Sequence, residues 1–152
     1  MDAINGWKLT PEQINEVYDP RLNKRLGKAP LVPAEIGCYL SHFKAWQSIA
    51  SGEVSGGFIF EDDFNAASNL GKILESLSCD ETGVWEMVKL FSYDQDPKTL
   101  AARELFEGAV IVQPFKVPTC LIGYGLTKNG ARQLVKKPLR FFRPVDEDQK
   151  FF

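Results

Sequence analysis

The sequence has 152 residues, of which 44% are hydrophobic and 25% are charged. A chain of this size and composition can bury one hydrophobic core, so we expect a single domain over residues 1–152 and neither a disordered segment nor a disulfide scaffold. The formal net charge of −2 argues against nucleic acid as the main partner, because nucleic acid demands a basic face.

The cysteines Cys38, Cys79 and Cys120 form no CxxC pair, which indicates reduced thiols instead of a zinc site or a disulfide framework. The sequence contains no apolar stretch long enough to span a bilayer, and its first residues lack the features of a signal peptide. We therefore expect a cytoplasmic protein. The basic, aromatic tail over residues 136–152 is expected to be a solvated loop, with peripheral contact to the inner membrane as the other interpretation.

The first strong element is a helix over residues 32–52. Apolar and aromatic residues recur there at helical spacing, Pro33 suits the first turn, and Gly52 marks the end. The same spacing places Glu35 and His42 beside the apolar stripe, at the boundary of the core. Before this helix, residues 1–31 are rich in turns and carry one short predicted helix between Pro11 and Tyr18.

Strands and helices alternate in the rest of the chain. Strands are predicted at 58–60, 84–93, 109–115 and 119–126, and helices at 70–78, 100–106 and 127–137, with Thr127 as the N-cap of the last. The alternation predicts an α/β sandwich with a mainly parallel sheet.

The segment GGFIFEDDF, residues 56–64, places three acids at the carboxyl end of an apolar strand, where ligands of open α/β sheets bind. Adjacent carboxylates repel one another, whereas a bound Mg²⁺ or Mn²⁺ converts the repulsion into attraction. In an extended segment alternate side chains point the same way. Glu61 and Asp63 are thus predicted to share one divalent cation, while Asp62 faces the opposite side.

The acidic segment has other interpretations. An acidic loop after a strand is often solvent-facing decoration or a helix N-terminus. A phosphorelay receiver would need a phosphoacceptor aspartate and a lysine at a strand end, neither of which can be placed here. A haloacid-dehalogenase-type phosphatase would need D-x-D-x-T, where this chain has EDDFN.

Four segments together resemble glycosyltransferase family 25, which includes lipopolysaccharide and lipooligosaccharide galactosyltransferases and collagen galactosyltransferases. They are LVPAEIGCYLSHFKAWQSIA, GGFIFEDDF, GYGLTKNGARQLV and RPVDEDQ, in this order. The resemblance implies a GT-A-type sandwich and an inverting, metal-dependent enzyme. Such an enzyme moves a hexose, with galactose expected ahead of glucose, from a UDP-sugar to a glycan or lipooligosaccharide acceptor.

The resemblance also implies roles for residues. The metal and diphosphate motif falls on Glu61, Asp62 and Asp63, and the GCxxSH pattern makes His42 a substrate contact. Gly123 and Tyr124 form a further predicted substrate contact, although glycine in a strand also marks bulges.

An inverting displacement needs a base to take the proton of the acceptor hydroxyl. Asp146, in the late PVD motif, is the candidate catalytic base, with Asp148 in reserve. Asp94 and Asp96 are read as solvated turn residues, or otherwise as acceptor contacts.

The sequence departs from the family pattern at its start, because MDAINGW resembles the segment that follows the usual first strand and helix. We expect an N-terminally shortened domain, whose exposed sheet edge would favour self-association into a homo-oligomer. The alternative function is a catalytically inactive remnant that acts as a binding or interaction module.

Overall fold

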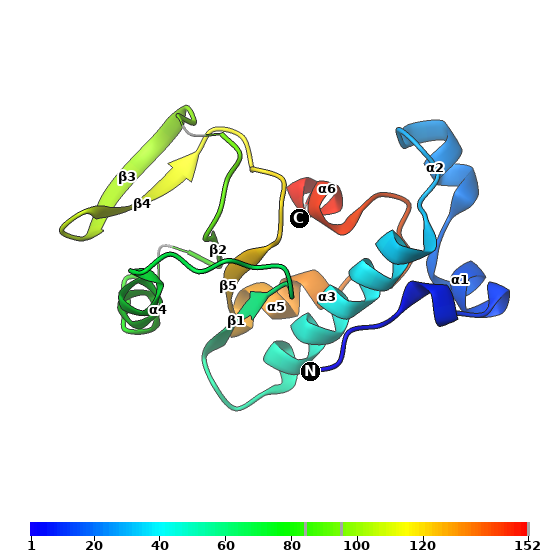
Figure 1. The fold of residues 1–152 in the computed structure, drawn as a ribbon, viewed down its shortest axis with the longest axis horizontal. Coiled ribbons are helices and arrows are strands. Elements are labelled where there is room, and N and C mark those ends of the chain that lie inside the picture. The colour runs from blue at the N-terminus through cyan, green and yellow to red at the C-terminus, as the bar shows by residue number, and fades with distance from the viewer. Residues whose placement is uncertain (84, 95, 152) are drawn as a thin grey trace.

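The computed structural model describes residues 1–83, 85–94 and 96–151 (Figure 1). The helices and strands follow one another in the order α1 (Pro11–Val17), α2 (Pro20–Leu26), α3 (Pro33–Ser51), β1 (Gly56–Phe60), α4 (Leu70–Ser78), β2 (Met87–Lys89), β3 (Thr99–Phe106), β4 (Ala109–Pro114), β5 (Gly123–Thr127), α5 (Lys128–Val135) and α6 (Val145–Asp148). Single 3₁₀ turns lie at Gly6–Lys8 and Gln149–Phe151. In Figure 1 the β3–β4 hairpin lies at one end of the molecule, α1 and α2 lie at the other, and α3 runs between them.

The helices with strong local signals are confirmed. α3 begins at Pro33, and the Glu35 carboxylate accepts a hydrogen bond from the backbone N–H of Val32 at 2.8 Å. At the start of α5 the Thr127 hydroxyl accepts from the backbone N–H of Gly130 at 3.0 Å. α1 and α4 also lie where the sequence predicts helices.

The prediction of a mainly parallel sheet is wrong. The described strands form a three-stranded sheet in the order β1-β5-β2 and a separate β3–β4 hairpin, and every pairing within them is antiparallel. β1 and β2 run in the same direction, but β5 lies between them and runs the opposite way. Alternating helices and strands in the sequence do not reveal that β5 inserts between β1 and β2, because this insertion depends on pairing between segments that are far apart in the sequence.

Three further expectations need correction. Residues 99–106 form a strand and not a helix, because they pair with β4 across a turn at Gly108, whose φ of 87° favours glycine. Residues 20–26, expected to be turn-rich chain, form the helix α2, which Asp19 caps and in which Pro20 occupies the first position. The tail is not a solvated loop: it contains α6, and Phe141 is only 2% exposed.

The core lies between α3, the three-stranded sheet and the tail. Its largest fully buried side chains are those of Trp46, Tyr124, Phe141, Ile36 and Leu126. The rings of Tyr39 and Phe141 stack with centroids 3.7 Å apart, which attaches the tail to α3. In the described part of the chain no helix is long and apolar enough to cross a membrane.

Part of the GCYLSH motif serves packing. A Cβ at Gly37 would lie 2.5 Å from the backbone oxygen of Ile4 and 2.5 Å from the nitrogen of Gly6, a distance that backbone atoms cannot tolerate. The hydroxyl of Ser41 accepts a hydrogen bond from the backbone N–H of Ile4 at 2.8 Å. Gly37 and Ser41 therefore hold the N-terminal segment against α3.

Candidate functional site

The acidic segment turns as soon as β1 ends. The backbone N–H of Glu61 still bonds to the carbonyl of Ile122 at 3.0 Å, and the N–H of Phe64 bonds back to the carbonyl of Glu61 at 3.2 Å. Asp62 and Asp63 occupy the resulting turn and are exposed, whereas Glu61 is half-buried. The expectation of an extended backbone here is wrong, so alternation of side chains along a strand does not place Glu61 and Asp63 on one side. Their metal-binding role stays a prediction.

A chain of hydrogen bonds runs from the core to Glu61. The indole N–H of Trp46 donates to the hydroxyl oxygen of Tyr124 at 2.8 Å, and this hydroxyl lies 2.8 Å from Nδ1 of His42. Nε2 of His42 lies 3.1 Å from Oε1 of Glu61. In this chain of hydrogen bonds Trp46 and His42 belong to α3, and Tyr124 belongs to β5. The sheet places β5 beside β1, whose end leads into Glu61.

The donors and acceptors of this chain assign the histidine tautomer. An indole N–H can only donate and a carboxylate can only accept. For a neutral imidazole, the Tyr124 hydroxyl therefore accepts from Trp46 and donates to Nδ1 of His42, and Nε2 carries the hydrogen that it donates to Glu61. Each member is satisfied in this arrangement. His42, which is 5% exposed, thus uses both ring nitrogens on protein groups and orients Glu61.

Cys38 lies one helical turn before His42. Its sulfur, a ring nitrogen of His42 and a carboxylate oxygen of Glu61 all lie within 4.8 Å of one another. Burial, together with the nearby charges of Glu61, Asp146 and Glu35, raises the pKa of the Cys38 thiol to about 11. A metal ion held by these three groups would take Cys38 as a thiolate, which its raised pKa disfavours, and would replace the hydrogen bond between Nε2 of His42 and Glu61.

The candidate base Asp146 lies in α6, which packs against α3. Its carboxylate accepts a hydrogen bond from the backbone N–H of Cys120 at 3.3 Å. Cys120 has a φ of 81°, a strained conformation for any residue other than glycine. The charges of Glu61 and Asp146 both contribute to the raised pKa of the Cys38 thiol. The reserve candidate Asp148 instead accepts from the Tyr39 hydroxyl at 2.7 Å.

Lys89 is a residue that the sequence reasoning missed. It ends β2, and its ammonium group donates to the backbone carbonyl of Pro118. Burial lowers the pKa of Lys89 to about 8, although the charge of Asp146 opposes this shift. The available signal was a lysine within the apolar run MVKLF, since a cation inside a strand needs a reason to be there.

The structure gives the other predicted residues different surroundings. Tyr124 is fully buried, so only its hydroxyl takes part in the site, through His42. A Cβ at Gly123 would lie 3.1 Å from the ring of Phe60 and 3.3 Å from that of Phe64, so this glycine makes room for two packed rings. Asp94 is exposed and accepts from the backbone N–H of Asp96 at 3.2 Å, as expected of a solvated turn.

Residues 1–148 match the family model described as "Glycosyltransferase family 25 (LPS biosynthesis protein)". The chain is 31% identical to "Inactive glycosyltransferase 25 family member 3" of Homo sapiens, over 97% of this chain and 25% of that protein. It is 28% identical to "Procollagen galactosyltransferase 1-A" of Xenopus laevis, over 97% of this chain and 25% of that protein. It thus spans about a quarter of the length of these relatives.

We predict that Tyr124→Phe destabilises the protein by about 2 kcal/mol, because it leaves the indole N–H of Trp46 and Nδ1 of His42 without their buried partner. Urea denaturation followed by tryptophan fluorescence measures this change. Tyr93→Phe is the matched control, since Tyr93 is 75% exposed. Equal stability of the two variants would contradict the hydrogen-bond chain.

We predict that Lys89 loses its proton with a midpoint near pH 8. The lowered pKa follows from burial, which disfavours the charged ammonium more than the charge of Asp146 favours it. Reductive ¹³C-methylation of the lysines followed by an NMR titration measures the midpoint, with Lys89→Met identifying the signal. A midpoint above pH 10 would show that Lys89 is solvated.

Proposed function

The chain belongs to glycosyltransferase family 25, and we propose that it transfers a hexose from a UDP-sugar to a hydroxyl of a glycan acceptor, with inversion at the anomeric carbon. The observation that carries the proposal is the arrangement at the end of β1. Glu61 is hydrogen-bonded to His42, and Asp62 and Asp63 are exposed in the following turn. The charges of Glu61 and Asp146 both contribute to the raised pKa of the Cys38 thiol.

Galactose is the hexose that we propose. The support is the presence of procollagen galactosyltransferases among the relatives. For the acceptor, the family description points to lipopolysaccharide and these relatives point to procollagen, so the proposal is limited to what they share, a hydroxyl on a glycan or glycoprotein.

The residues after β1 fit a divalent cation, Mn²⁺ or Mg²⁺. Carboxylate oxygens are the ligands that these hard ions prefer, and the turn presents two exposed carboxylates directly after Glu61. We propose that Glu61 and Asp63 would hold the ion and that Asp62 contacts substrate. The ion would supply positive charge for the diphosphate of the donor.

The protein's own groups would act on the acceptor. Asp146 would take the proton of the acceptor hydroxyl as its oxygen bonds to the anomeric carbon. The bond from that carbon to the diphosphate oxygen breaks at the same time, and the electron pair leaves with the UDP. Lys89, as an ammonium, would place positive charge near Asp146.

The second candidate is a domain that binds ligand without turnover. The observation in its favour is that the matched relatives from human, rat, mouse and cattle carry "inactive" in their names. Such a domain would keep the hydrogen-bonded core around His42, because that core stabilises the fold whether or not transfer occurs.

We predict that UDP binds the protein at least about tenfold more tightly in Mn²⁺ than in EDTA, and that Asp63→Ala abolishes this gain because it removes one predicted cation ligand. Isothermal titration calorimetry measures both affinities. Glu81→Ala serves as the matched control, since Glu81 is an exposed acid after α4. Absence of UDP binding by the folded protein would reject the transferase proposal.

We predict that Asp146→Asn lowers the rate of UDP-galactose hydrolysis or transfer by at least about 100-fold while UDP affinity stays the same, since an amide cannot accept the proton. Release of UDP in a coupled assay measures the rate. Asp148→Asn should keep most of the activity if Asp146 is the base. Near-normal turnover by a folded Asp146→Asn protein would assign the base to another residue, and turnover absent from the wild type would favour the binding domain.

A further inference from the structure

Two segments far apart in the sequence are strongly basic. No acidic residue lies between Asp19 and Glu35 or between Glu107 and Asp146. The cations in these segments include Arg21, Lys24, Arg25, Lys28, Lys136, Lys137, Arg140 and Arg143. In a chain with a net charge of −2, this concentration makes the local surface positive although the whole protein is slightly negative.

The fold places the two segments side by side. Tyr18 and Phe141 form a parallel β-bridge, in which the N–H of Asp19 donates to the carbonyl of Phe141 at 2.9 Å and the N–H of Phe141 donates to that of Val17 at 2.8 Å. Both Tyr18 and Phe141 are buried, so the junction is part of the core. The basic segments are therefore held together by the backbone and not by a fluctuating surface contact.

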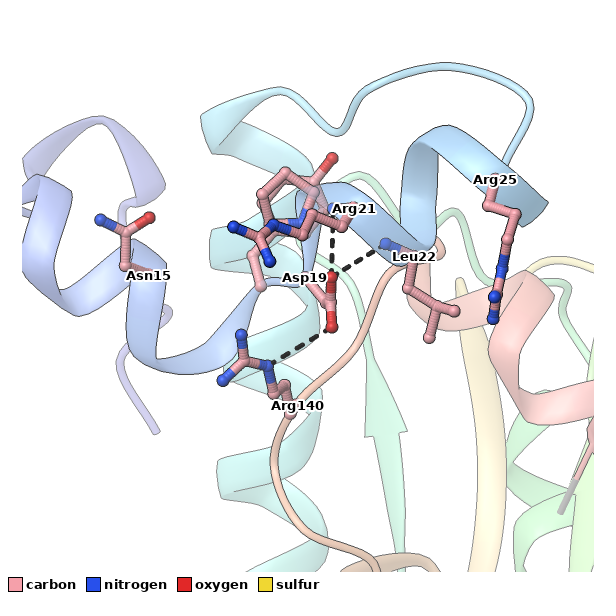
Figure 2. A pocket seen from close by; sticks show the side chains of 8 residues that line it. Asn15, Asp19, Arg21, Leu22, Arg25 and Arg140 are labelled. Atoms are coloured by element: carbon pink, nitrogen blue, oxygen red, sulfur yellow. Dashed lines mark hydrogen bonds and ion pairs between the residues drawn. The ribbon is translucent and has the colours of Figure 1, made fainter.

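A surface pocket lies at this junction (Figure 2). It is lined by Asn15, Tyr18, Asp19, Pro20, Arg21, Leu22, Arg25 and Arg140. In the view of Figure 2 the guanidinium groups of Arg21 and Arg140 lie on one side of Asp19, and Arg25 lies on the other side, beyond Leu22. The pocket shares no residue with the site around Glu61.

Asp19 compensates only part of this charge. One of its carboxylate oxygens accepts from the backbone N–H groups of Leu22 and Arg21, at 2.9 and 3.1 Å. The other lies 3.7 Å from Nε of Arg140. The hydrogen bond from Leu22, assisted by the charges of Arg140 and Arg21, lowers the pKa of Asp19. Asp19 thus interacts with Arg140 and Arg21, whereas Arg25 also lines the pocket and forms no ion pair with any other described residue.

We propose that this pocket binds a phosphate group of an anionic ligand. A phosphate oxygen pair matches the planar donor fork of arginine, and a second anion would offset the positive charge that Asp19 leaves uncompensated. Asn15 adds an amide that can donate to a phosphate oxygen. The phosphate can belong to a soluble diphosphate compound or to a lipid headgroup, and the chemistry of recognition is the same for both.

Inorganic pyrophosphate in EDTA is the probe, because EDTA removes any contribution of a cation at Glu61 and Asp63. Calorimetry at low salt should show binding that weakens as NaCl is added. Arg25→Gln and Arg140→Gln should each lower the affinity at least about tenfold. Arg132→Gln on α5, an exposed arginine outside the pocket, is the matched control and should leave the affinity unchanged.

Arg25→Gln removes no described ion pair, so it tests the pocket even if Arg140→Gln perturbs the fold through Asp19. Absence of pyrophosphate binding, or an equal loss in Arg132→Gln, would overturn the proposal. Sedimentation with phosphatidylcholine vesicles that contain phosphatidylglycerol separates the sources. Sedimentation that pyrophosphate reverses supports the pocket with a lipid phosphate as its ligand, and pyrophosphate binding without sedimentation supports it with a soluble one. Neither result depends on the transferase proposal, which Asp63→Ala and Asp146→Asn test.

Discussion

The hydrogen bond between the indole of Trp46 and the hydroxyl of Tyr124 determines how α3 sits on the sheet. Both side chains are fully buried and their polar atoms are 2.8 Å apart. Rotating or sliding α3 would leave an indole N–H and a phenol unpaired in the core, which costs about 1–3 kcal/mol for each group. Since His42 lies one turn before Trp46 on the same helix, this bond also decides where the imidazole meets Glu61. The candidate site thus depends on core packing.

Local signals predicted α1, α3, α4 and α5, and distant pairing escaped prediction. Pro33, the helical spacing of apolar residues and the Thr127 cap are read within a few residues, and α3 and α5 lie where those signals placed them. The position of β5 between β1 and β2 depends on backbone pairing across more than one element, for which the sequence carries no local mark. The same is true of β3, whose residues suit a helix until Gly108 and β4 turn them into a hairpin.

The candidate site was predicted to a similar degree. The acids at the end of β1 could be read directly, and so could the place of His42 at the boundary of the core. The contact between His42 and Glu61, and the hydrogen bond from the backbone of Cys120 to Asp146, required the fold. Lys89 was not among the predicted site residues, because a lysine in a short strand is expected at an exposed edge until its burial is known.

The tail after α5 joins the two charged regions of the molecule. It carries Arg140 to the basic pocket and Asp146 to the acidic site, so its position matters to both. Tyr39 holds this tail at two points: its ring stacks on Phe141, and its hydroxyl donates to Asp148. Asp146 lies between these anchors. Because one aromatic side chain of α3 contacts the segment on both sides of Asp146, the placement of Asp146 depends on the same helix that carries His42, and α3 is the common support of the acidic residues.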